Sequence, residues 1–398
     1  MATLSVIIVS YNVRHYLHQC LDSVVRATKG LEADIWVVDN ASSDDSVSVL
    51  GAAFPQVHFV QNTTNVGFAR ANNQAIRQSQ GDYVLLLNPD TIVGEETLHT
   101  CLQLLETHPH IGATGTRMLN RDGSFAAESR RGVPTPMVSF YKVSGLCRLF
   151  PRSRTFGRYY MRYLDENQTS AIEVMSGAFM MLRREALEEA GLLCEDYFMY
   201  GEDIDLSYTL LGHGWENWYT PAHILHYKGE STQKTSLRYV QTFYNAMLIF
   251  FDKHFAHRYR LMALLIRLAV VLKGAADFCL RRLHKLLKRL TPQRHEAPER
   301  LLFVGSDEAW DEVQRLCHDH GYEVVRCPYD AAHLGHVSDY AHSHQVLYAL
   351  YQTDAEVASY DTILDLMQLG HHLGMRVHLA TYSSATHTIL LPGDILTP

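Results

Sequence analysis

The sequence lacks the features that mark several protein classes. Its seven cysteines include no CxxC pair and no metal-ligand spacing, which indicates reduced thiols in a reducing compartment. Only 12 prolines and 24 glycines, and no internal repeat, argue against a low-complexity or repeat protein. No basic region precedes the first short apolar run, so we expect no signal peptide and a cytoplasmic location.

The composition is that of a globular protein, with 47% apolar and 20% charged residues. A chain of 398 residues is too long for one ordinary domain. We expect an α/β domain over 1–256, a basic amphipathic helix with a linker over 257–298, and a second, small Rossmann-like α/β domain over 299–398.

The first hundred residues alternate between strand and helix patterns. Leu4–Val9 is a continuous apolar run, which is typical of a strand buried on both faces. Further strands are expected at 35–38, 57–60 and 83–87, and helices at 14–28 and 68–79. This alternation predicts a Rossmann-like, mostly parallel sheet, and such sheets bind ligands at the carboxyl ends of their strands.

Polar clusters follow three of these strands: Ser10-Tyr11-Asn12, Asp39-Asn40 and Asn88-Pro89-Asp90. A carboxylate at Asp90 is well placed to hold a divalent cation against a pyrophosphate. Read alone, the tripeptide is also a good turn sequence. Asp39-Asn40 suits either hydrogen bonding to a base or ribose, or the capping of a turn.

Gly67 and Arg70 lie where a helix is expected to begin, so the backbone there could approach an anion. A plain helix start explains them equally well.

Carboxylates gather at a second helix start, where Glu202, Asp203 and Asp205 share one turn. The helix dipole alone favours acids there, but one of them could take a proton from a hydroxyl group. His226 could be a second metal ligand, or an ordinary member of the 23 histidines. Before these motifs, residues 124–169 lose all periodicity, which predicts a long irregular insertion near an active site.

Taken in order, these segments resemble glycosyltransferase family 2, whose members are inverting enzymes with the GT-A fold. The most similar branch contains the rhamnosyltransferase-like enzymes that build bacterial surface polysaccharides. The matching segments are residues 5–12, 37–44, 65–69, 87–90, 176–178, 198–206 and 226–231.

The resemblance implies a role for each matched residue. The nucleotide and its phosphates would be bound by Ser10, Tyr11, Asp39, Asn40, Gly67, Arg70, Asn73 and Asn88. Asp90 and His226 would hold Mg²⁺ or Mn²⁺, and Gly177 and Ala178 would line the donor or acceptor pocket. Asp203 would be the general base, while Glu202 would orient the acceptor or the base. Asn88 replaces the first aspartate of the family's Asp-x-Asp motif, so a carbonyl oxygen is kept and a charge is lost.

Residues 257–290 form a strongly amphipathic pattern, with leucines on one face and basic residues on the other. Nine Lys/Arg and one Asp lie between Arg258 and Leu290, so this segment carries +8 and the rest of the chain −16, since the total is −8. We expect a helix lying on the cytoplasmic face of the inner membrane. The alternative is a helix packed on the first domain or in a homo-oligomer interface.

The last hundred residues begin with a strand, Gly305 and a helix, but have no G-x-G-x-x-G motif, so they make a poor dinucleotide site. Phe303–Ser306, Ser359–Ile363 and Leu369-Gly370 resemble the nucleotide-binding-like domain of bacterial polyprenyl-phosphate sugar phosphotransferases. That resemblance implies a regulatory or assembly role.

The resemblance thus predicts an inverting glycosyltransferase that moves rhamnose or another hexose or deoxyhexose. The donor would be a dTDP- or UDP-sugar, the acceptor a glycan or polyprenyl-linked glycan, and no nucleic acid would bind. The alternative is a catalytically silent nucleotide-sugar-binding regulatory or assembly protein. A processive synthase is disfavoured because no Gln-x-x-Arg-Trp motif follows the predicted base.

Overall fold

The computed structural model describes residues 3–229, 237–255, 299–328, 346–375 and 377–398. The predicted basic helix and linker at 257–298 lie outside the described residues. Within the described ranges, no helix is both long and apolar enough to cross a membrane.

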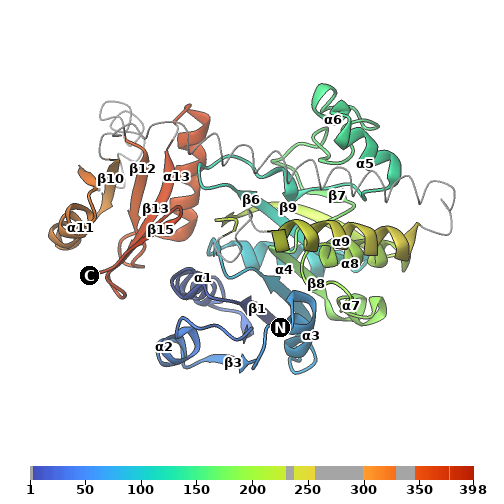
Figure 1. Ribbon diagram of the computed structural model, residues 1–398, viewed down its shortest axis with the longest axis horizontal. Coiled ribbons are helices and arrows are strands. Elements are labelled where there is room, and N and C mark those ends of the chain that lie inside the picture. Colours follow the sequence, from blue (N-terminus) through green and yellow to red (C-terminus); the bar gives the residue numbers. More distant parts are fainter. Residues whose placement is uncertain (1–2, 230–236, 256–298, 329–345, 376) are drawn as a thin grey trace.

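The N-terminal part of the chain is built on one mixed sheet of nine strands in the order β3-β2-β1-β4-β8-β6-β9-β5, with β7 paired to β9 (Figure 1). The strands are β1 (Thr3–Ser10), β2 (Glu32–Asp39), β3 (Val57–Gln61), β4 (Tyr83–Leu87), β5 (Thr91–Val93), β6 (Ile111–Leu119), β7 (Ser170–Ile172), β8 (Phe179–Arg183) and β9 (Glu216–His226). The first four are mutually parallel, as predicted. Antiparallel β8 then joins them to the parallel pair β6 and β9.

Alternate residues of the central strand β1 face opposite sides of the sheet. Val6 and Ile8 enter a core shared with α1 (Arg14–Ala27) and α4 (Thr97–Thr107). Ile7 and Val9 enter a second core. That core is shared with α3 (Phe68–Ile76), α7 (Arg184–Ala190) and α8 (Glu202–Gly212). Burial on both faces explains why these strands read as continuous apolar runs.

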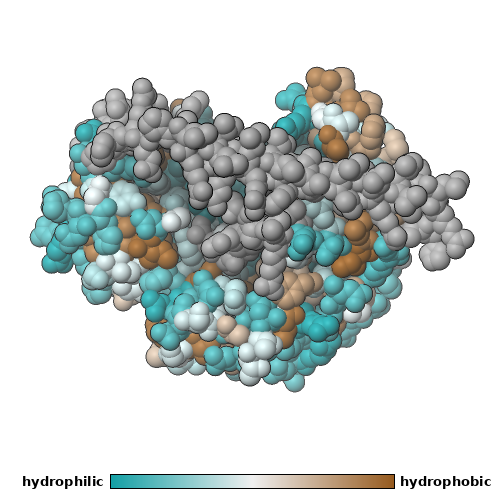
Figure 2. All heavy atoms as spheres, viewed as in Figure 1, coloured by the Kyte–Doolittle hydropathy of each residue, from teal (hydrophilic) through white to brown (hydrophobic). Residues whose placement is uncertain are grey.

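Two short helices interrupt the segment that was predicted to be irregular. They are α5 (Pro136–Val143) and α6 (Leu146–Leu149), preceded by the 3-10 turn η1 (Ala127–Ser129). The hydroxyl of Thr135 caps α5 by accepting from the Val138 N–H, and Pro136 occupies the first turn. Figure 2 shows apolar surface gathered over this pair, which projects from the body of the domain in Figure 1.

Two more helices complete the N-terminal part. They are α2 (Ser46–Ala53) and α9 (Leu237–His254). The second continues the chain beyond β9 and packs beside α8, as an ion-pair cluster described below shows.

The C-terminal part is a second, six-stranded sheet in the order β11-β10-β12-β13-β14-β15. Its elements are β10 (Arg300–Gly305), α11 (Asp307–Asp319), β11 (Glu323–Pro328), β12 (Tyr348–Gln352), α13 (Tyr360–His372), β13 (His378–Ser383), β14 (Thr388–Leu391) and β15 (Asp394–Leu396). Four strands are parallel and the last two are antiparallel. The fold class is therefore α/β in both parts, as predicted.

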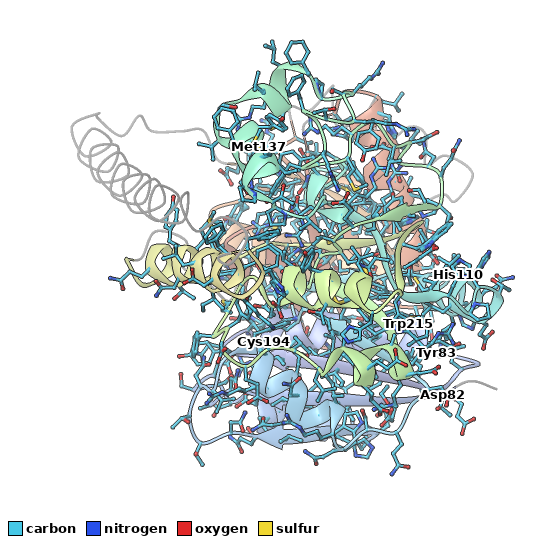
Figure 3. All side chains as sticks on the ribbon, turned by 90° about the vertical axis from the view of Figure 1, so that its right-hand side faces the viewer. Asp82, Tyr83, His110, Met137, Cys194 and Trp215 are labelled. Atoms are coloured by element: carbon cyan, nitrogen blue, oxygen red, sulfur yellow. The ribbon has the colours of Figure 1, made fainter. Side chains whose placement is uncertain are left out.

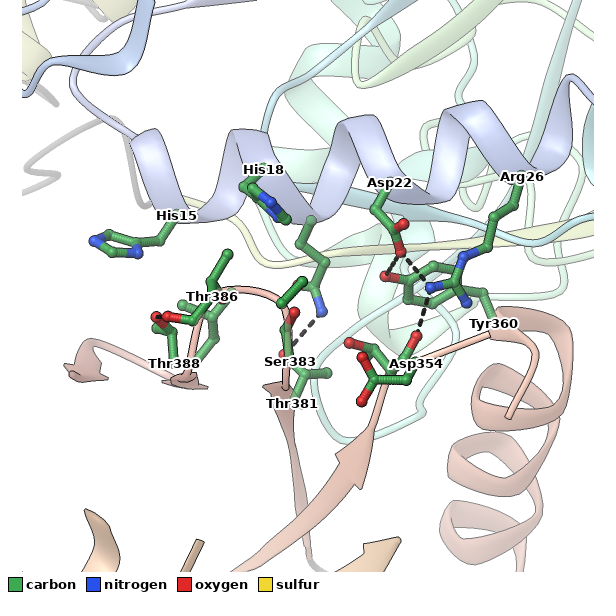
Figure 4. Close-up of a pocket in the computed structure, with 14 residues that line it drawn as sticks. His15, His18, Asp22, Arg26, Asp354, Tyr360, Thr381, Ser383, Thr386 and Thr388 are labelled. Atoms are coloured by element: carbon green, nitrogen blue, oxygen red, sulfur yellow. Dashed lines mark hydrogen bonds and ion pairs between the residues drawn. The ribbon is translucent and has the colours of Figure 1, made fainter. Parts of the chain in front are cut away.

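The two sheets share a hydrophobic core, in which Tyr16 and Tyr227 pack with residues of β12, β13 and α13. Helix α1 supplies the polar contacts as well (Figure 4). Asp22 accepts a 2.8 Å hydrogen bond from the Tyr360 hydroxyl, and Gln19 Nε2 donates to Thr381 Oγ1 at 2.8 Å. A cavity of about 70 Å³ remains between α1 and the second sheet. This volume is too small for a nucleotide-sugar.

Candidate active site

The carboxyl ends of β1 and β2 leave two polar side chains in need of a partner. Ser10 and Asp39 are neighbours in register and almost fully buried. Asp39 Oδ2 accepts from the Ser42 N–H at 3.0 Å. Within the described part of the chain, Asp39 Oδ1 and the Ser10 hydroxyl have no hydrogen-bond partner. Since buried polar groups are normally satisfied, this edge suits a ligand that carries both donors and acceptors.

The next segment shows why Gly67 is a glycine. Its φ is +89°, and a Cβ added there would lie 2.6 Å from the carbonyl oxygen of Phe198. That carbonyl accepts a 2.8 Å hydrogen bond from the Phe68 N–H, so the loop before α8 lies directly on the start of α3. The close backbone approach at Gly67 is therefore to Phe198. Asn40 Nδ2 donates to the Gly67 carbonyl at 3.3 Å, while Tyr11 is exposed at the rim.

Arg70 and Asn73, predicted to lie along the nucleotide, both contact Glu195. Arg70 Nε lies 3.7 Å from a Glu195 oxygen, and its side chain is 60% exposed. Asn73 is buried, and its amide bonds the Glu195 carboxylate at 3.0 Å and the Leu193 backbone in both directions. The structure thus uses Asn73 to hold this loop, while the exposed Arg70 stays accessible from solvent. A phosphate contact for either residue stays a prediction.

Three of the predicted residues meet beyond β4. Asp90 is buried, and its Oδ1 lies 3.3 Å from Nε2 of His226. The Asn88 amide nitrogen lies 3.3 Å from the same ring atom. The Asp90 backbone is also tied to the far strand, because its carbonyl accepts from the Tyr227 N–H at 3.0 Å.

The electrostatics of this cluster keep Asp90 ionised. Burial alone would raise the pKa of Asp90, but the His226 ring and the Gly229 N–H, 3.3 Å from Oδ2, outweigh it and lower that pKa. No set of three or more His, Cys, Asp or Glu side chains with the geometry of a metal site occurs in the described ranges. Asp90 and His226 offer one carboxylate and one imidazole, so a divalent ion bound there would take its other ligands from water and substrate phosphates.

Asp203 lies in the first turn of α8 and is held from two directions. Arg131 Nη2 lies 2.5 Å from Asp203 Oδ2, and both side chains are largely buried. The Gly177 N–H donates to the same oxygen at 3.1 Å. The other oxygen accepts from the Ile204 N–H at 2.8 Å. A carboxylate has about four lone-pair positions, so these bonds leave one free to accept a proton.

Gly177 and Ala178 connect the two halves of the site. While Gly177 binds Asp203, the carbonyl of Ala178 accepts a 3.0 Å hydrogen bond from the Asn88 N–H. A Cβ on Gly177 would lie 3.2 Å from that of Asp203, which is tighter than ordinary contact. Two adjacent backbone groups thus fix the distance between the Asp90 cluster and the Asp203 carboxylate.

Glu202 differs sharply from its neighbour. It is buried, and one of its carboxyl oxygens has no hydrogen-bond partner among the described residues. Burial, together with the adjacent Asp203 charge, raises the pKa of Glu202 to about 8. At neutral pH Glu202 is mostly protonated and can donate a hydrogen bond.

The third acid of the turn, Asp205, has a structural role. Its carboxylate accepts from His254 Nε2 at 2.6 Å and from Lys253 Nζ at 2.8 Å, both on α9. The Tyr197 hydroxyl donates to the same oxygen as His254, at 3.4 Å. Asp205 therefore joins α9 to α8 and to the loop before the site.

Two pairs that the sequence interpretation missed support the site. Arg131 binds Asp203, and Lys228, two residues after His226, forms an ion pair with Glu128. In each pair, one residue belongs to the segment 124–169, which was predicted to be irregular. The only sequence signal was the density of arginines there, which does not reveal a partner.

Comparison with known proteins supports the resemblance to glycosyltransferases. Residues 5–191 match the family described as Glycosyl transferase family 2. The N-acetylglucosaminyl-diphospho-decaprenol L-rhamnosyltransferase of Mycobacterium tuberculosis is 27% identical over 264 residues, which cover 63% of this chain and 85% of that protein.

More distant similarities were also found. The low-salt glycan biosynthesis hexosyltransferase Agl10 of Haloferax volcanii is 27% identical over 209 residues, or 52% of this chain and 60% of that one. A mannosyltransferase from Pyrobaculum calidifontis, solved with GDP-Man and Mn²⁺, aligns with a TM-score of 0.43 and 19% identity over 72% of this chain and 80% of its own. The N-terminal part of the chain therefore matches glycosyltransferase family 2 over residues 5–191, just under half of the chain, and is similar to glycosyltransferases at 27% identity.

Proposed function

We propose that this glycosyltransferase inverts the anomeric carbon of the sugar that it transfers. The single observation that carries the proposal is the pairing of two chemically different groups through Gly177-Ala178. Asp203 has a lone pair free for a proton, and the ionised carboxylate of Asp90, beside His226, suits a cation. An inverting displacement needs a base and a leaving-group stabiliser on opposite sides of the sugar.

In this mechanism the acceptor hydroxyl gives its proton to Asp203 as its oxygen attacks the anomeric carbon. The bond from that carbon to the donor diphosphate breaks, and the nucleoside diphosphate leaves. Mg²⁺ or Mn²⁺ bound at Asp90 and His226 would neutralise charge on the departing diphosphate. Glu202, protonated at pH 7, would donate a hydrogen bond to the acceptor or to the base, and Arg131 would hold the base in place.

We place the nucleotide at the ends of β1 and β2. The Ser10 hydroxyl and the Asp39 oxygen, which have no partner among the described residues, would bind the base or ribose, with Tyr11 and Asn40 beside them. The exposed Arg70, at the start of α3, would reach the phosphates, with Gly67 and Asn73 behind it. Asn88 would complete this contact next to the metal, and Gly177 and Ala178 would line the sugar.

The mycobacterial relative guides the choice of substrates. Its name describes transfer of L-rhamnose to an N-acetylglucosaminyl-diphospho-decaprenol acceptor. We propose a dTDP- or UDP-linked hexose or deoxyhexose as donor and a glycan or polyprenyl-linked glycan as acceptor. A polyprenyl-linked acceptor is consistent with a transfer reaction at the cytoplasmic face of the membrane. We further propose domains at 1–256 and 299–398, joined by the basic segment, with a regulatory or assembly role for the second.

The contacts of Asp203 with Arg131 and the Gly177 N–H favour one alternative function, a protein that binds a nucleotide-sugar without transferring the sugar. If Arg131 and Gly177 held the carboxylate permanently, donor would bind and no sugar would move.

Release of nucleoside diphosphate distinguishes the two functions. The purified chain is incubated with dTDP-rhamnose or UDP-sugars, Mn²⁺ and bacterial membrane extract as the source of acceptor. The proposal predicts diphosphate release that requires both extract and metal. Donor binding by calorimetry with no release under any of these conditions would support the silent alternative.

A further inference from the structure

The surface of α5 and α6 exposes an unusual concentration of large apolar side chains. We call Met137, Phe140, Val143, Leu149 and Phe150 the α5–α6 patch. Leu149 is 70% exposed, Val143 64% and Phe140 56%. Five of the thirteen exposed large apolar side chains of the described residues fall in these 14 positions, whereas the others lie singly or in pairs. Single exposed apolar residues need no explanation, but a cluster indicates a partner.

The patch is held outward by the packing beneath it. Val138 and Cys147 fill the inner side of the two helices and are buried. Gly145, with φ +83°, makes the turn between the helices. The ring of Phe156 lies 5.1 Å from Tyr141 and 5.5 Å from Phe150, which supports the patch from below. In Figure 3, Met137 lies in the upper part of the molecule, far from Asp82, which directly precedes β4.

The segment that carries the patch has charge of one sign, although one of its cations, Arg158, forms an ion pair with Glu173 from outside the segment. Residues 137–162 contain six Lys/Arg and no Asp or Glu, in a chain whose total charge is −8. Arg148, Arg152, Arg154 and Arg162 are exposed. The Lys142 ammonium lies 3.6 Å from the ring centroid of Tyr159, at the foot of the patch. An apolar protrusion on a segment rich in exposed cations complements a surface with an apolar interior and an anionic face.

The patch and the candidate active site belong to one continuous segment. Arg131, which binds Asp203, lies five residues before the start of α5. Its backbone pairs with Val174, so the segment is anchored beside the loop that holds Asp203. A partner bound at the patch would therefore lie on the insertion that also contributes to the site.

We propose that the α5–α6 patch inserts into the headgroup region of an anionic phospholipid bilayer and docks the enzyme on it. The aromatic and aliphatic side chains enter the interface, and the surrounding arginines contact lipid phosphates. The patch is separate in sequence from the basic segment at 257–290. The inference goes beyond the proposed function and does not depend on catalysis.

Vesicle flotation of the full chain tests this proposal. Vesicles contain equal parts phosphatidylcholine and phosphatidylglycerol, or phosphatidylcholine alone. The patch variant is Phe140→Asp with Leu149→Asp. The control variant is Val49→Asp with Leu373→Asp, which makes the same charge change at two exposed apolar positions elsewhere. All variants are checked for an unchanged thermal midpoint.

We expect the native chain to bind the anionic vesicles and the patch variant to bind about tenfold or more weakly, because it loses apolar insertion and gains repulsion. The control should bind within about twofold of the native chain. Equal binding by the patch variant, or no flotation of the native chain, would overturn the proposal. Sedimentation velocity that shows a native dimer and a monomeric patch variant would also overturn it, because the patch would then be a subunit contact.

Discussion

Glu202 and Asp203 are adjacent in sequence but lie in opposite electrostatic surroundings. Asp203 faces a guanidinium and a backbone N–H, whereas Glu202 is buried beside a like charge. Two neighbouring carboxyl groups thus have opposite partners, and such a difference in environment can separate an acid from a base.

The raised pKa of Glu202 predicts a pH-dependent cost to stability. The folded protein binds this proton more tightly than the unfolded chain, so stability from this group is present below about pH 4.3 and is lost as pH rises towards 8. Glu202→Gln removes the titration. Its thermal midpoint relative to the native chain should therefore rise between about pH 5 and 9. A difference that does not change with pH would show that Glu202 is ionised throughout.

Asp90 gives a second prediction at this scale. With nucleoside diphosphate present, Mn²⁺ should raise the thermal midpoint of the native chain, because a ligand of the folded state stabilises it. Asp90→Asn should remove that increase, whereas the exposed Asp45→Asn should keep it. An unchanged increase in the Asp90 variant would place the metal elsewhere.

Individual site residues were predictable to different degrees. The meeting of Asn88, Asp90 and His226 follows from polar residues at strand ends, taken in the order of a known family. Arg131 was not predictable, because its partner lies 72 positions away and nothing periodic surrounds it. The packing role of Gly67 was not predictable either, because its contact partner, Phe198, belongs to a loop without regular structure.

At the scale of elements, α8 and α9 are joined through one carboxylate. Asp205 is buried, and burial alone would raise its pKa, but the bonds from His254 and Lys253 lower it. The same helix start carries Asp203, so the Asp205 cluster fixes the element that presents the proposed base.

Asp205→Asn should therefore lower the free energy of unfolding by about 2 kcal/mol, since it leaves a cation facing a neutral partner. The partly exposed Lys253 keeps the loss at the low end of the range. Denaturant unfolding measures this loss, with the exposed Asp311→Asn as control. The difference in the free energy of unfolding between the native chain and the variant should shrink on acidification. A carboxyl group with a lowered pKa loses its contribution to stability as it becomes protonated. A gap independent of pH would contradict the ion-pair account.

The predictable elements are those whose burial leaves a recognisable pattern of apolar residues in the sequence. The strands β1 to β4 are apolar because both faces are covered, and α1 and α3 alternate with them. Helices α5 and α6 were missed because their exposed faces are apolar, which hides the helical period. The Thr135-Pro136 start signal was the available clue.

At the scale of the whole molecule, the second sheet is linked to the Asp90–His226 cluster through α1. Gln19 donates to Thr381 and accepts a 2.8 Å hydrogen bond from the Tyr227 hydroxyl. Tyr227 follows His226 directly, and its N–H binds the Asp90 carbonyl. One buried amide therefore links the C-terminal sheet to the residue beside a proposed metal ligand.

Gln19→Leu should weaken this link and lower stability by about 1–3 kcal/mol, because two buried hydroxyls lose its hydrogen bonds. It should also reduce the Mn²⁺-dependent increase in thermal midpoint. The exposed Gln103→Leu should do neither. Loss of stability with an unchanged metal response would show that the contact is only structural.

Asp203 carries the central claim, that the enzyme transfers sugar by a two-sided displacement. The most direct measurement is sugar transfer by Asp203→Asn, paired with donor binding by calorimetry. The amide keeps the size of the side chain but cannot accept the acceptor's proton. The account predicts transfer reduced by about a thousandfold or more, with donor affinity within about threefold of the native chain. Full transfer by this variant would contradict it.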